Sequence, residues 1–170
     1  MDAEAPDSKR IADEQGVKSY PTIKYFAAGS KEPVPYEGGR SEKAFIDFLN
    51  EKAGTHRAVG GKLSATAGTI ASLDMIIQQV IDSGKDAIVA ADEVIKAAKK
   101  ETGNKFAEYY AKVAAKIKNN AGYVDKELKR LEGMLKKGSL APEKVDDLTR
   151  RSNILKKFKG VVTSDEKSEL

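Results

Sequence analysis

Apolar residues after position 69 recur at a helical period, in five segments separated by glycines. Side chains three and four positions apart share one face of a helix, so each segment predicts an amphipathic helix. The five stripes are Ile70, Leu73, Ile76, Ile77, Val80 and Ile81; Ile88, Ala91, Ile95 and Ala98; Phe106, Tyr109, Tyr110, Val113 and Ile117; Val124, Leu128, Leu131 and Leu135; and Val145, Leu148, Leu155 and Phe158. Such narrow stripes are buried only by neighbouring helices, which predicts a compact five-helix bundle over residues 69–160.

Capping signals place the ends of these helices. Thr69 is a candidate N-cap for the first helix, and Pro142 occupies the first-turn position that proline favours in the last one. Breaks are predicted at Gly84, Gly103, Gly122 and Gly138.

Residues 1–53 have a mixed α/β pattern. A short helix around Ile11 is expected to end at Gly16, and the β-branched and aromatic run at residues 22–26 predicts a strand. A turn at residues 27–30 and a second extended segment at 33–36 complete a predicted hairpin. Ser41 then offers its hydroxyl as the N-cap of a helix whose apolar face needs a sheet to cover.

The composition changes to Gly, Ala, Thr and Ser over residues 54–68, which predicts a linker between two separately packed units. The expected fold class is therefore α+β followed by all-α. The expected domains are residues 1–53, a linker at 54–68, a helical domain at 69–160 and a flexible tail at 161–170.

The chain has no Cys and one His, His56. Thiol nucleophiles, disulfides and thiolate metal sites all need sulfur, and zinc or iron sites need several nitrogen or sulfur ligands. We therefore expect no catalytic residue, no metal and no cofactor. The first residues include Asp2 and Glu4 instead of a basic segment with an apolar core, so no signal peptide is expected within the chain. No apolar run is long enough for membrane insertion.

The net charge of +4 lies mostly on the helical half and permits an anionic partner. Nucleic-acid binding is one hypothesis. Acidic residues such as Asp125, Glu127 and Glu132 are interleaved with the basic ones there, which argues against a phosphate-binding face, so we expect no nucleic acid. Binding at low salt that falls steeply with added salt would revive the hypothesis.

Four segments of the first half occur in a specific order: residues 19–26 (SYPTIKYF), 29–33 (GSKEP), 36–40 (YEGGR) and 48–52 (FLNEK). This order resembles the second half of a thioredoxin domain from protein disulfide isomerases. The resemblance implies a partial thioredoxin-like fold in which Pro21 follows a cis bond, and in which Tyr20, Pro21 and Thr22 contact extended polypeptide substrates. It also implies that the end of a central strand lies near residues 1–4 and that the catalytic Cys-x-x-Cys lies upstream of this chain.

A hairpin with one helix is marginally stable in water, so we expect residues 1–53 to be partly disordered or to form a homo-oligomer through their uncovered face.

Three segments of the second half, residues 106–110 (FAEYY), 127–131 (ELKRL) and 150–158 (RRSNILKKF), resemble the C-terminal helical domain of endoplasmic reticulum resident protein 29, also called the D domain. That family uses the domain to bind polypeptides or partners. The resemblance leaves two interpretations of Tyr109 and Tyr110, peptide binding or core packing with hydroxyls at the rim. We favour core packing because aromatic stripes at helical spacing usually form core.

The last four residues, Lys167, Ser168, Glu169 and Leu170, are similar to the Lys-Asp-Glu-Leu retrieval signal, which a receptor binds at an exposed C-terminus. This predicts that the parent protein resides in the endoplasmic reticulum lumen. We expect a noncatalytic folding factor that binds unfolded or partly folded polypeptides. The alternative is a fragment of an active protein disulfide isomerase.

Overall fold

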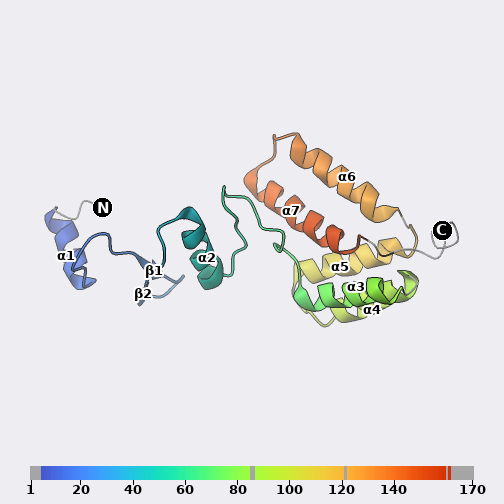
Figure 1. The fold of residues 1–170 in the computed structure, drawn as a ribbon, viewed down its shortest axis with the longest axis horizontal. Helices are drawn as coiled ribbons and strands as arrows, with labels where there is room; N and C mark the ends of the chain where they lie inside the picture. The colour runs from blue at the N-terminus through green and yellow to red at the C-terminus, as the bar shows by residue number, and fades with distance from the viewer. Residues whose placement is uncertain (1–4, 85–86, 121, 160, 162–170) are drawn as a thin grey trace. The chain divides into compact units, whose positions relative to one another are not determined.

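The computed structural model describes residues 5–84, 87–120, 122–159 and 161, which cluster into two compact units, residues 1–55 and residues 56–170. The first unit holds a two-stranded hairpin and two helices, and the second is entirely helical apart from one isolated bridge (Figure 1). The predicted fold class, α+β followed by a five-helix domain, is confirmed. The strand end expected at residues 1–4 lies outside the described residues.

In the first unit, helix α1 (Pro6–Glu14) is followed by the antiparallel strands β1 (Lys24–Phe26) and β2 (Pro33–Pro35). Their register pairs Lys24 with Pro35, Tyr25 with Val34 and Phe26 with Pro33. Gly16, with φ of 63°, follows the helix and lets the chain turn toward the hairpin, because a left-handed φ is easily adopted only by glycine.

Helix α2 (Glu42–Ala53) covers one face of the hairpin. The Ser41 hydroxyl accepts a hydrogen bond of 3.2 Å from the backbone N–H of Ala44, so the predicted N-cap is confirmed. The Tyr36 ring centroid lies 4.9 Å from those of both Phe45 and Phe48, and Tyr25 makes an edge contact with Phe48 at 5.8 Å. This aromatic cluster holds the helix on the strands.

The cluster does not form a closed core. No residue of α2 is buried, and Ala12 is the one buried apolar residue among the described residues of this unit. Tyr20, Phe26 and Leu49 remain 69%, 47% and 45% exposed. A unit with so little buried apolar area gains little stability from the hydrophobic effect.

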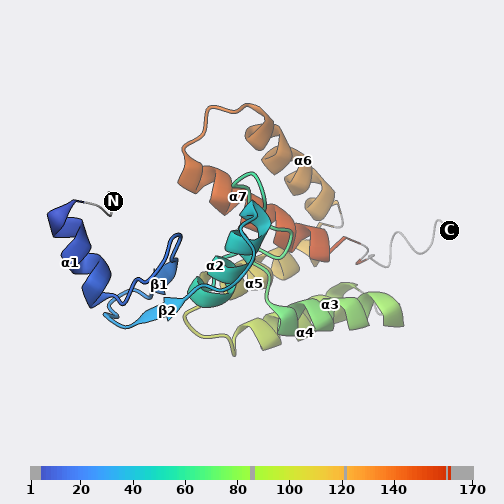
Figure 2. The ribbon, with the colours of Figure 1, turned by 60° about the vertical axis from the view of Figure 1, so that its left-hand side comes forward.

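The second unit contains α3 (Ala71–Ser83), α4 (Ala87–Ala98), α5 (Lys105–Ile117), α6 (Tyr123–Lys136) and α7 (Pro142–Lys157). Helices α3, α4 and α5 lie side by side, and α6 packs along α7 on the other side of the bundle (Figures 1 and 2). Its fully buried large side chains are Leu73, Ile77, Val94, Tyr110, Val113, Ile117, Leu131, Ile154 and Leu155. This core joins all five helices, which is why the five narrow stripes are stable together.

Three details differ from the sequence prediction. Thr69 is not the N-cap of α3. That position belongs to Ile70, which makes no side-chain cap, while the Thr69 hydroxyl donates to the Thr66 carbonyl at 2.9 Å. Ile88 is 47% exposed and Val94 takes its place in the core. Val145, in the first turn of α7, is 37% exposed. Both exposed residues lie at the start of a helix, where fewer neighbouring helices cover the stripe.

The segment before α3 packs against α7. The buried Asn153 side chain of α7 donates hydrogen bonds of 3.0 and 3.1 Å to the carbonyls of Ser64 and Ala67. Arg57 forms a bidentate pair with Asp146, with N–O distances of 3.0 and 2.5 Å. Residues 56–69 are therefore fastened to the bundle by polar contacts.

Within the part of the chain that the structure describes, no helix combines the length and the apolar character needed to cross a bilayer.

Candidate functional site

The chain's potential chemistry is limited by its side-chain types. Without Cys it has no thiolate to attack a disulfide. Among the described residues, no group of three or more His, Cys, Asp or Glu side chains is arranged to hold a metal ion.

The loop at Tyr20, Pro21 and Thr22 joins α1 to β1 and is exposed throughout. The Tyr20–Pro21 bond is cis, as the thioredoxin resemblance implies. The Thr22 hydroxyl donates to the Ser19 carbonyl at 2.6 Å and closes a local turn. Tyr20 is 69% exposed, so its ring is available to another polypeptide.

Tyr110 lies in the bundle core with 0% of its surface exposed. Its hydroxyl donates to the Asp74 carboxylate and accepts a hydrogen bond of 3.2 Å from the backbone N–H of Ile70. Asp74 in turn pairs with Lys157 at 3.0 Å. The chain of contacts ties α5 to α3 and α7. The placement agrees with the core-packing interpretation of Tyr110.

Tyr109, one position earlier on α5, lies at the surface of the bundle core and is half-buried. The Arg151 guanidinium stands 5.1 Å from the centre of its ring. Its hydroxyl is buried and has no hydrogen-bond partner among the described residues. Burial raises the pKa of this hydroxyl well above its ordinary value, and the nearby Tyr123 and Glu127 raise it further. Tyr109 therefore stays neutral at physiological pH.

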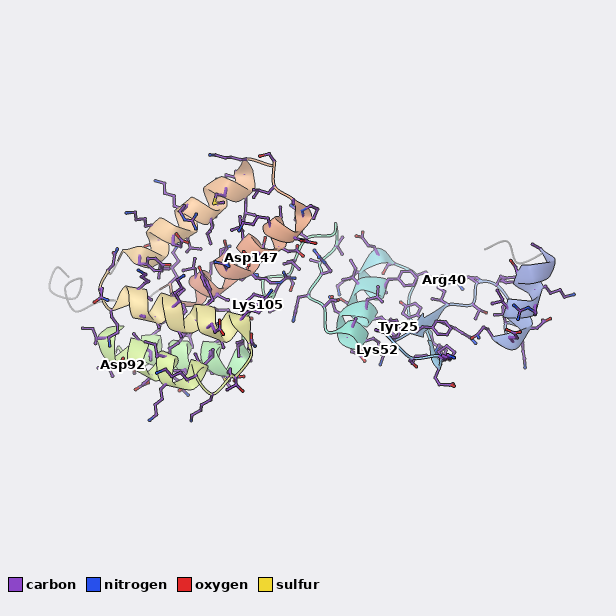
Figure 3. All side chains as sticks on the ribbon, turned by 180° about the vertical axis from the view of Figure 1, so that it is seen from behind. Tyr25, Arg40, Lys52, Asp92, Lys105 and Asp147 are labelled. Carbon is purple, nitrogen blue, oxygen red and sulfur yellow. The ribbon has the colours of Figure 1, made fainter. Side chains whose placement is uncertain are left out.

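A cleft of about 240 Å³ opens beside Tyr109, between α5 and α7. Its lining consists of Lys105, Phe106, Glu108, Tyr109 and Lys112 from α5, with Asp147 and Arg151 from α7. Figure 3 labels Lys105 and Asp147, which mark the two helices. Pockets for small molecules commonly measure about 300–1,000 Å³. The smaller cleft suits individual side chains of a bound polypeptide better than a whole cofactor.

The lining carries three cations, Lys105, Lys112 and Arg151, and two carboxylates, Glu108 and Asp147, which leaves a positive excess of one charge. Arg151 is partly neutralised by Asp147, 3.1 Å away, and the Lys105 ammonium lies 5.2 Å from the centre of the Phe106 ring. The partly exposed rings of Phe106 and Tyr109 next to cations can accept both apolar and acidic side chains of a partner.

Next to the cleft, α6 contributes an ion pair. Arg130 donates to Glu127 through two bonds of 2.7 Å, and these bonds lower the pKa of the Glu127 carboxyl. Burial raises the pKa of the Tyr123 hydroxyl, and the negative charge of Glu127 raises it further. The Arg130 charge offsets that of Glu127, and the two groups shift the pKa of Tyr109 in opposite directions.

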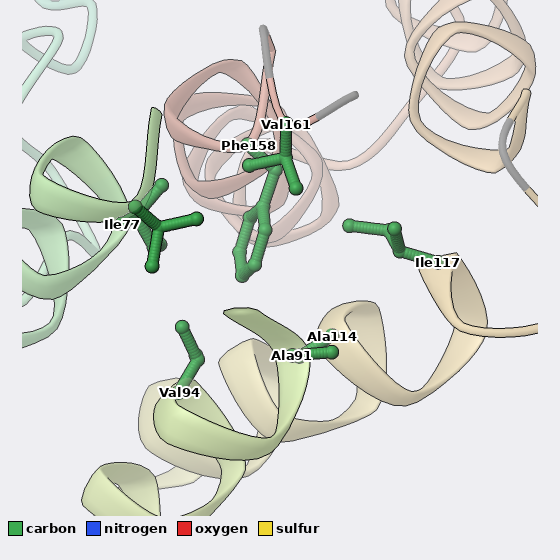
Figure 4. Close-up of a pocket in the computed structure, with 8 residues that line it drawn as sticks. Ile77, Ala91, Val94, Ala114, Ile117, Phe158 and Val161 are labelled. Carbon is green, nitrogen blue, oxygen red and sulfur yellow. The ribbon is translucent and has the colours of Figure 1, made fainter. Parts of the chain in front are cut away.

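A second cavity lies inside the bundle and is entirely apolar. It measures about 10 Å³ and is lined by residues that include Ile77, Val94, Ile117 and Phe158 (Figure 4). A water molecule needs about this volume together with two or more polar partners, and the lining provides none. The cavity is a packing gap and offers no ligand site.

The candidate retrieval signal, Lys167 to Leu170, lies outside the described residues. The structure brings Tyr109 and Phe106, which the apolar pattern had placed on one helix face, together with Lys112 and Arg151, to which the sequence gave no role. Arg151 lies in the segment 150–158, which carries the resemblance to the D domain without assigning this residue a role. The signal that was available is its spacing: Asp147 and Arg151 are four residues apart on one helix face.

Residues 68–158 match the family model described as the C-terminal domain of endoplasmic reticulum protein ERp29. The chain is 59% identical over 160 residues to protein disulfide-isomerase tigA of Aspergillus niger, covering 94% of this chain and 43% of that relative. It is 49% identical over 172 residues to protein disulfide-isomerase erp38 of Neurospora crassa, covering 100% of this chain and 47% of that relative. Protein disulfide isomerase-like 2-2 of Oryza sativa subsp. japonica is 37% identical over 161 residues, covering 91% of this chain and 43% of that relative. The chain thus spans less than half the length of these relatives.

Proposed function

The chain belongs to the ERp29 C-terminal domain family and is related along most of its length to protein disulfide isomerases, and from this premise we propose that it is an endoplasmic-reticulum folding factor that binds polypeptides without exchanging disulfides. The family match supports the folding role, and the absence of Cys supports the noncatalytic part. The observation that carries the binding role is the cleft between α5 and α7.

The proposed client is an unfolded or partly folded polypeptide segment with aromatic and acidic side chains. Aromatic side chains would pack on Phe106 and Tyr109, and acidic ones would face Lys105, Lys112 or Arg151. The exposed loop at Tyr20 would add a second contact, as the family resemblance implies. Weak contacts of this kind fit a protein that must bind many sequences and release them.

Binding can be measured by fluorescence anisotropy with a reduced, carboxymethylated polypeptide that stays unfolded. Two variants of α5 make a matched pair, Lys112→Glu in the cleft and Lys116→Glu outside its lining. Both residues are exposed and both changes alter the net charge equally. We expect Lys112→Glu to weaken binding about fivefold, or about 1 kcal/mol, and Lys116→Glu to leave it within about twofold. Equal effects would refute the cleft as the binding site.

The loop is tested in the same assay. Tyr20→Ala removes a ring that is 69% exposed, and Val59→Ala, at a residue 56% exposed, serves as the control. Because both side chains are largely in solvent, neither change should unfold the chain. Weaker client binding in Tyr20→Ala alone is the expected result, and unchanged binding would remove the loop from the proposal.

The alternative is that these residues are the noncatalytic part of a longer, active protein disulfide isomerase. Two observations favour this alternative: the relatives are protein disulfide isomerases, and the chain spans less than half of their length. An insulin reduction assay on the 170-residue chain separates the chain's own activity from that of any longer protein. We expect no activity above a no-protein control, and activity above that control would overturn the noncatalytic assignment.

We assign the four residues at the C-terminus to a retrieval receptor of the endoplasmic reticulum. A secreted reporter that ends in residues 161–170 should be retained in cells. The same reporter lacking Leu170 should appear in the medium, since the receptor binds the terminal residue. Equal secretion of the two reporters would contradict the assignment.

A further inference from the structure

The segment that precedes α3 packs against α7, and we call residues 56–69 the strap. The Ser64 N–H donates to the His56 carbonyl at 2.8 Å, which folds the first part of the strap into a narrow turn. The second part is held by the buried Asn153 side chain, and Ala67 there has 0% of its surface exposed. The strap is therefore packed as part of the helical unit, although its composition predicted a linker.

Asp146 of α7 holds two arginines at once. Its carboxylate accepts two hydrogen bonds from Arg57 of the strap, and one of the same oxygens lies 3.6 Å from the Arg150 guanidinium. The Asp146 side chain is 17% exposed. A bidentate pair with a partly buried carboxylate has a fixed geometry, unlike most surface ion pairs. Arg57 therefore orients the carboxylate that Arg150 faces.

Arg150 is also confined by the strap backbone. A Cβ added at Gly68 would lie 2.6 Å from the Arg150 Cβ and 3.0 Å from its Cγ, which shows how closely the strap approaches the root of this side chain. A long side chain that is confined in this way has few rotamers left. The strap thus limits where the Arg150 guanidinium can lie.

The Arg150 guanidinium reaches the wall of the cleft. It lies 6.0 Å from the centre of the ring of Phe106, which lines the cleft on α5. At this distance a cation is attracted to the face of an aromatic ring. Contacts therefore extend from the strap, through Asp146 and Arg150, to the wall of the α5–α7 cleft.

We propose that the strap holds the Phe106 wall of this cleft in place through Arg150. Arg57 and Asp146 are then positioning residues, since neither is among the residues that line the cleft. When the strap detaches from α7, Arg150 loses the pairing and the backbone that confine it, and the Phe106 ring loses a fixed neighbour. The consequence for clients rests on the proposed function: the docked strap raises client affinity, and a bound client stabilises the docked strap by the same factor.

The link between strap and wall can be measured without a client, because the chain has no Trp. Phe106→Trp places one tryptophan in the wall, and its quenching by acrylamide reports how exposed the wall is. Adding Arg57→Ala should raise the quenching constant and shift the emission to longer wavelength. Lys118→Ala is the matched control, because it also removes one positive charge and breaks an ion pair, with Asp92 at 2.8 Å. Adding Lys118→Ala should change neither quantity, and the same quenching with and without Arg57→Ala would overturn the proposal.

Client binding and amide hydrogen exchange provide two further measurements. In the anisotropy assay, Arg57→Ala should weaken client binding about threefold and Lys118→Ala should leave it unchanged. In an Arg150→Ala background, Arg57→Ala should weaken binding no further, because Arg150 carries the link. Exchange in residues 64–69 should be faster in Arg57→Ala, and slower in the unaltered chain when a client is bound.

The combined results distinguish this proposal from the proposed function. If quenching responds to Arg57→Ala but client binding responds to neither Arg57→Ala nor Lys112→Glu, the link stands and the cleft is not the client site. If client binding falls with Lys112→Glu but not with Arg57→Ala, the strap does not control the cleft and the proposal is wrong. Additive losses in the variant that combines Arg57→Ala with Arg150→Ala would contradict the role of Arg150.

Discussion

The Tyr110 hydroxyl is the polar group whose removal should affect the bundle most directly. Tyr110→Phe keeps the buried ring, which packs 5.8 Å from Phe158, and removes both hydrogen bonds of the hydroxyl. The bond donated to Asp74 has a charged acceptor, and such bonds contribute about 1.5–3 kcal/mol. The N–H of Ile70 also loses its acceptor at a partly buried position.

Two features limit the loss. The Asp74 side chain is 18% exposed, so water reaches it in part, and it keeps Lys157 at 3.0 Å. We therefore expect Tyr110→Phe to lower the free energy of unfolding by about 2–3 kcal/mol and the melting temperature by about 10 °C or more. The free energy of unfolding is measured by urea denaturation, monitored by far-ultraviolet circular dichroism because the helices dominate that signal.

The neighbouring Tyr109 supplies the matched control. Its hydroxyl is buried without a partner among the described residues, so Tyr109→Phe removes no hydrogen bond. This variant should unfold within about 0.5 kcal/mol of the unaltered chain, or be slightly more stable. Equal destabilisation by the two variants, or a loss below about 0.5 kcal/mol for Tyr110→Phe, would refute the assignment of Tyr110 as the polar tether of the core.

Three further predictions concern the same bundle. Gly68 has φ of +81°, and a Cβ added there would lie 2.6 Å from the Arg150 Cβ, whereas a Cβ added at Gly60, with φ of +80°, would have no atom within 4 Å. Left-handed strain alone should lower the stability of Gly60→Ala by roughly 1 kcal/mol. Thermal melts should show that Gly68→Ala loses clearly more. Asn153→Ala removes two hydrogen bonds from a buried site; the Ser64 carbonyl keeps the Ala67 N–H at 3.1 Å, whereas the Ala67 carbonyl loses its Asn153 donor. Urea unfolding should therefore show a loss of about 2 kcal/mol, and a loss under about 0.5 kcal/mol would mean that the segment before α3 is not fastened there. Burial, and after it the hydrogen bond to Asp74, raises the pKa of the Tyr110 hydroxyl above its ordinary 10.0, so the hydroxyl contributes fully to stability below pH 10 and its contribution is lost as the pH rises further. The urea midpoint should therefore fall above about pH 10, and less steeply in Tyr110→Phe. Identical dependences of the midpoint on pH in the two proteins would contradict this.

The helical half could be predicted closely because its signals are local. Helix period, the glycine breaks and the first-turn position of Pro142 depend on residues within a few positions of one another. The same is true of the Ser41 cap and of the hairpin between Lys24 and Pro35. The N-cap of α3 was predicted at Thr69, because threonine is a favoured capping residue, and lies one residue later, at Ile70.

The candidate cleft could not be predicted, because its residues come from two helices that are about forty residues apart in the sequence. Tyr109 and Tyr110 are adjacent and chemically identical. Tyr110 is fully buried and hydrogen-bonded, whereas Tyr109 lies at the cleft and its hydroxyl has no hydrogen-bond partner among the described residues. That difference depends on where α3 and α7 pack around α5. Likewise, the composition of residues 54–68 indicated a linker and gave no sign of the contacts with Asn153.

The sequence by itself determined the chemistry: a chain without sulfur nucleophiles, with a hairpin and helices whose faces are set by the 2.0 and 3.6 residue periods. Tertiary structure decided which members of those faces are buried and which charges meet. The physical reason is the distance along the chain over which each interaction acts. Period and capping act within a turn or two of backbone, whereas burial and ion pairing depend on segments that only folding brings together.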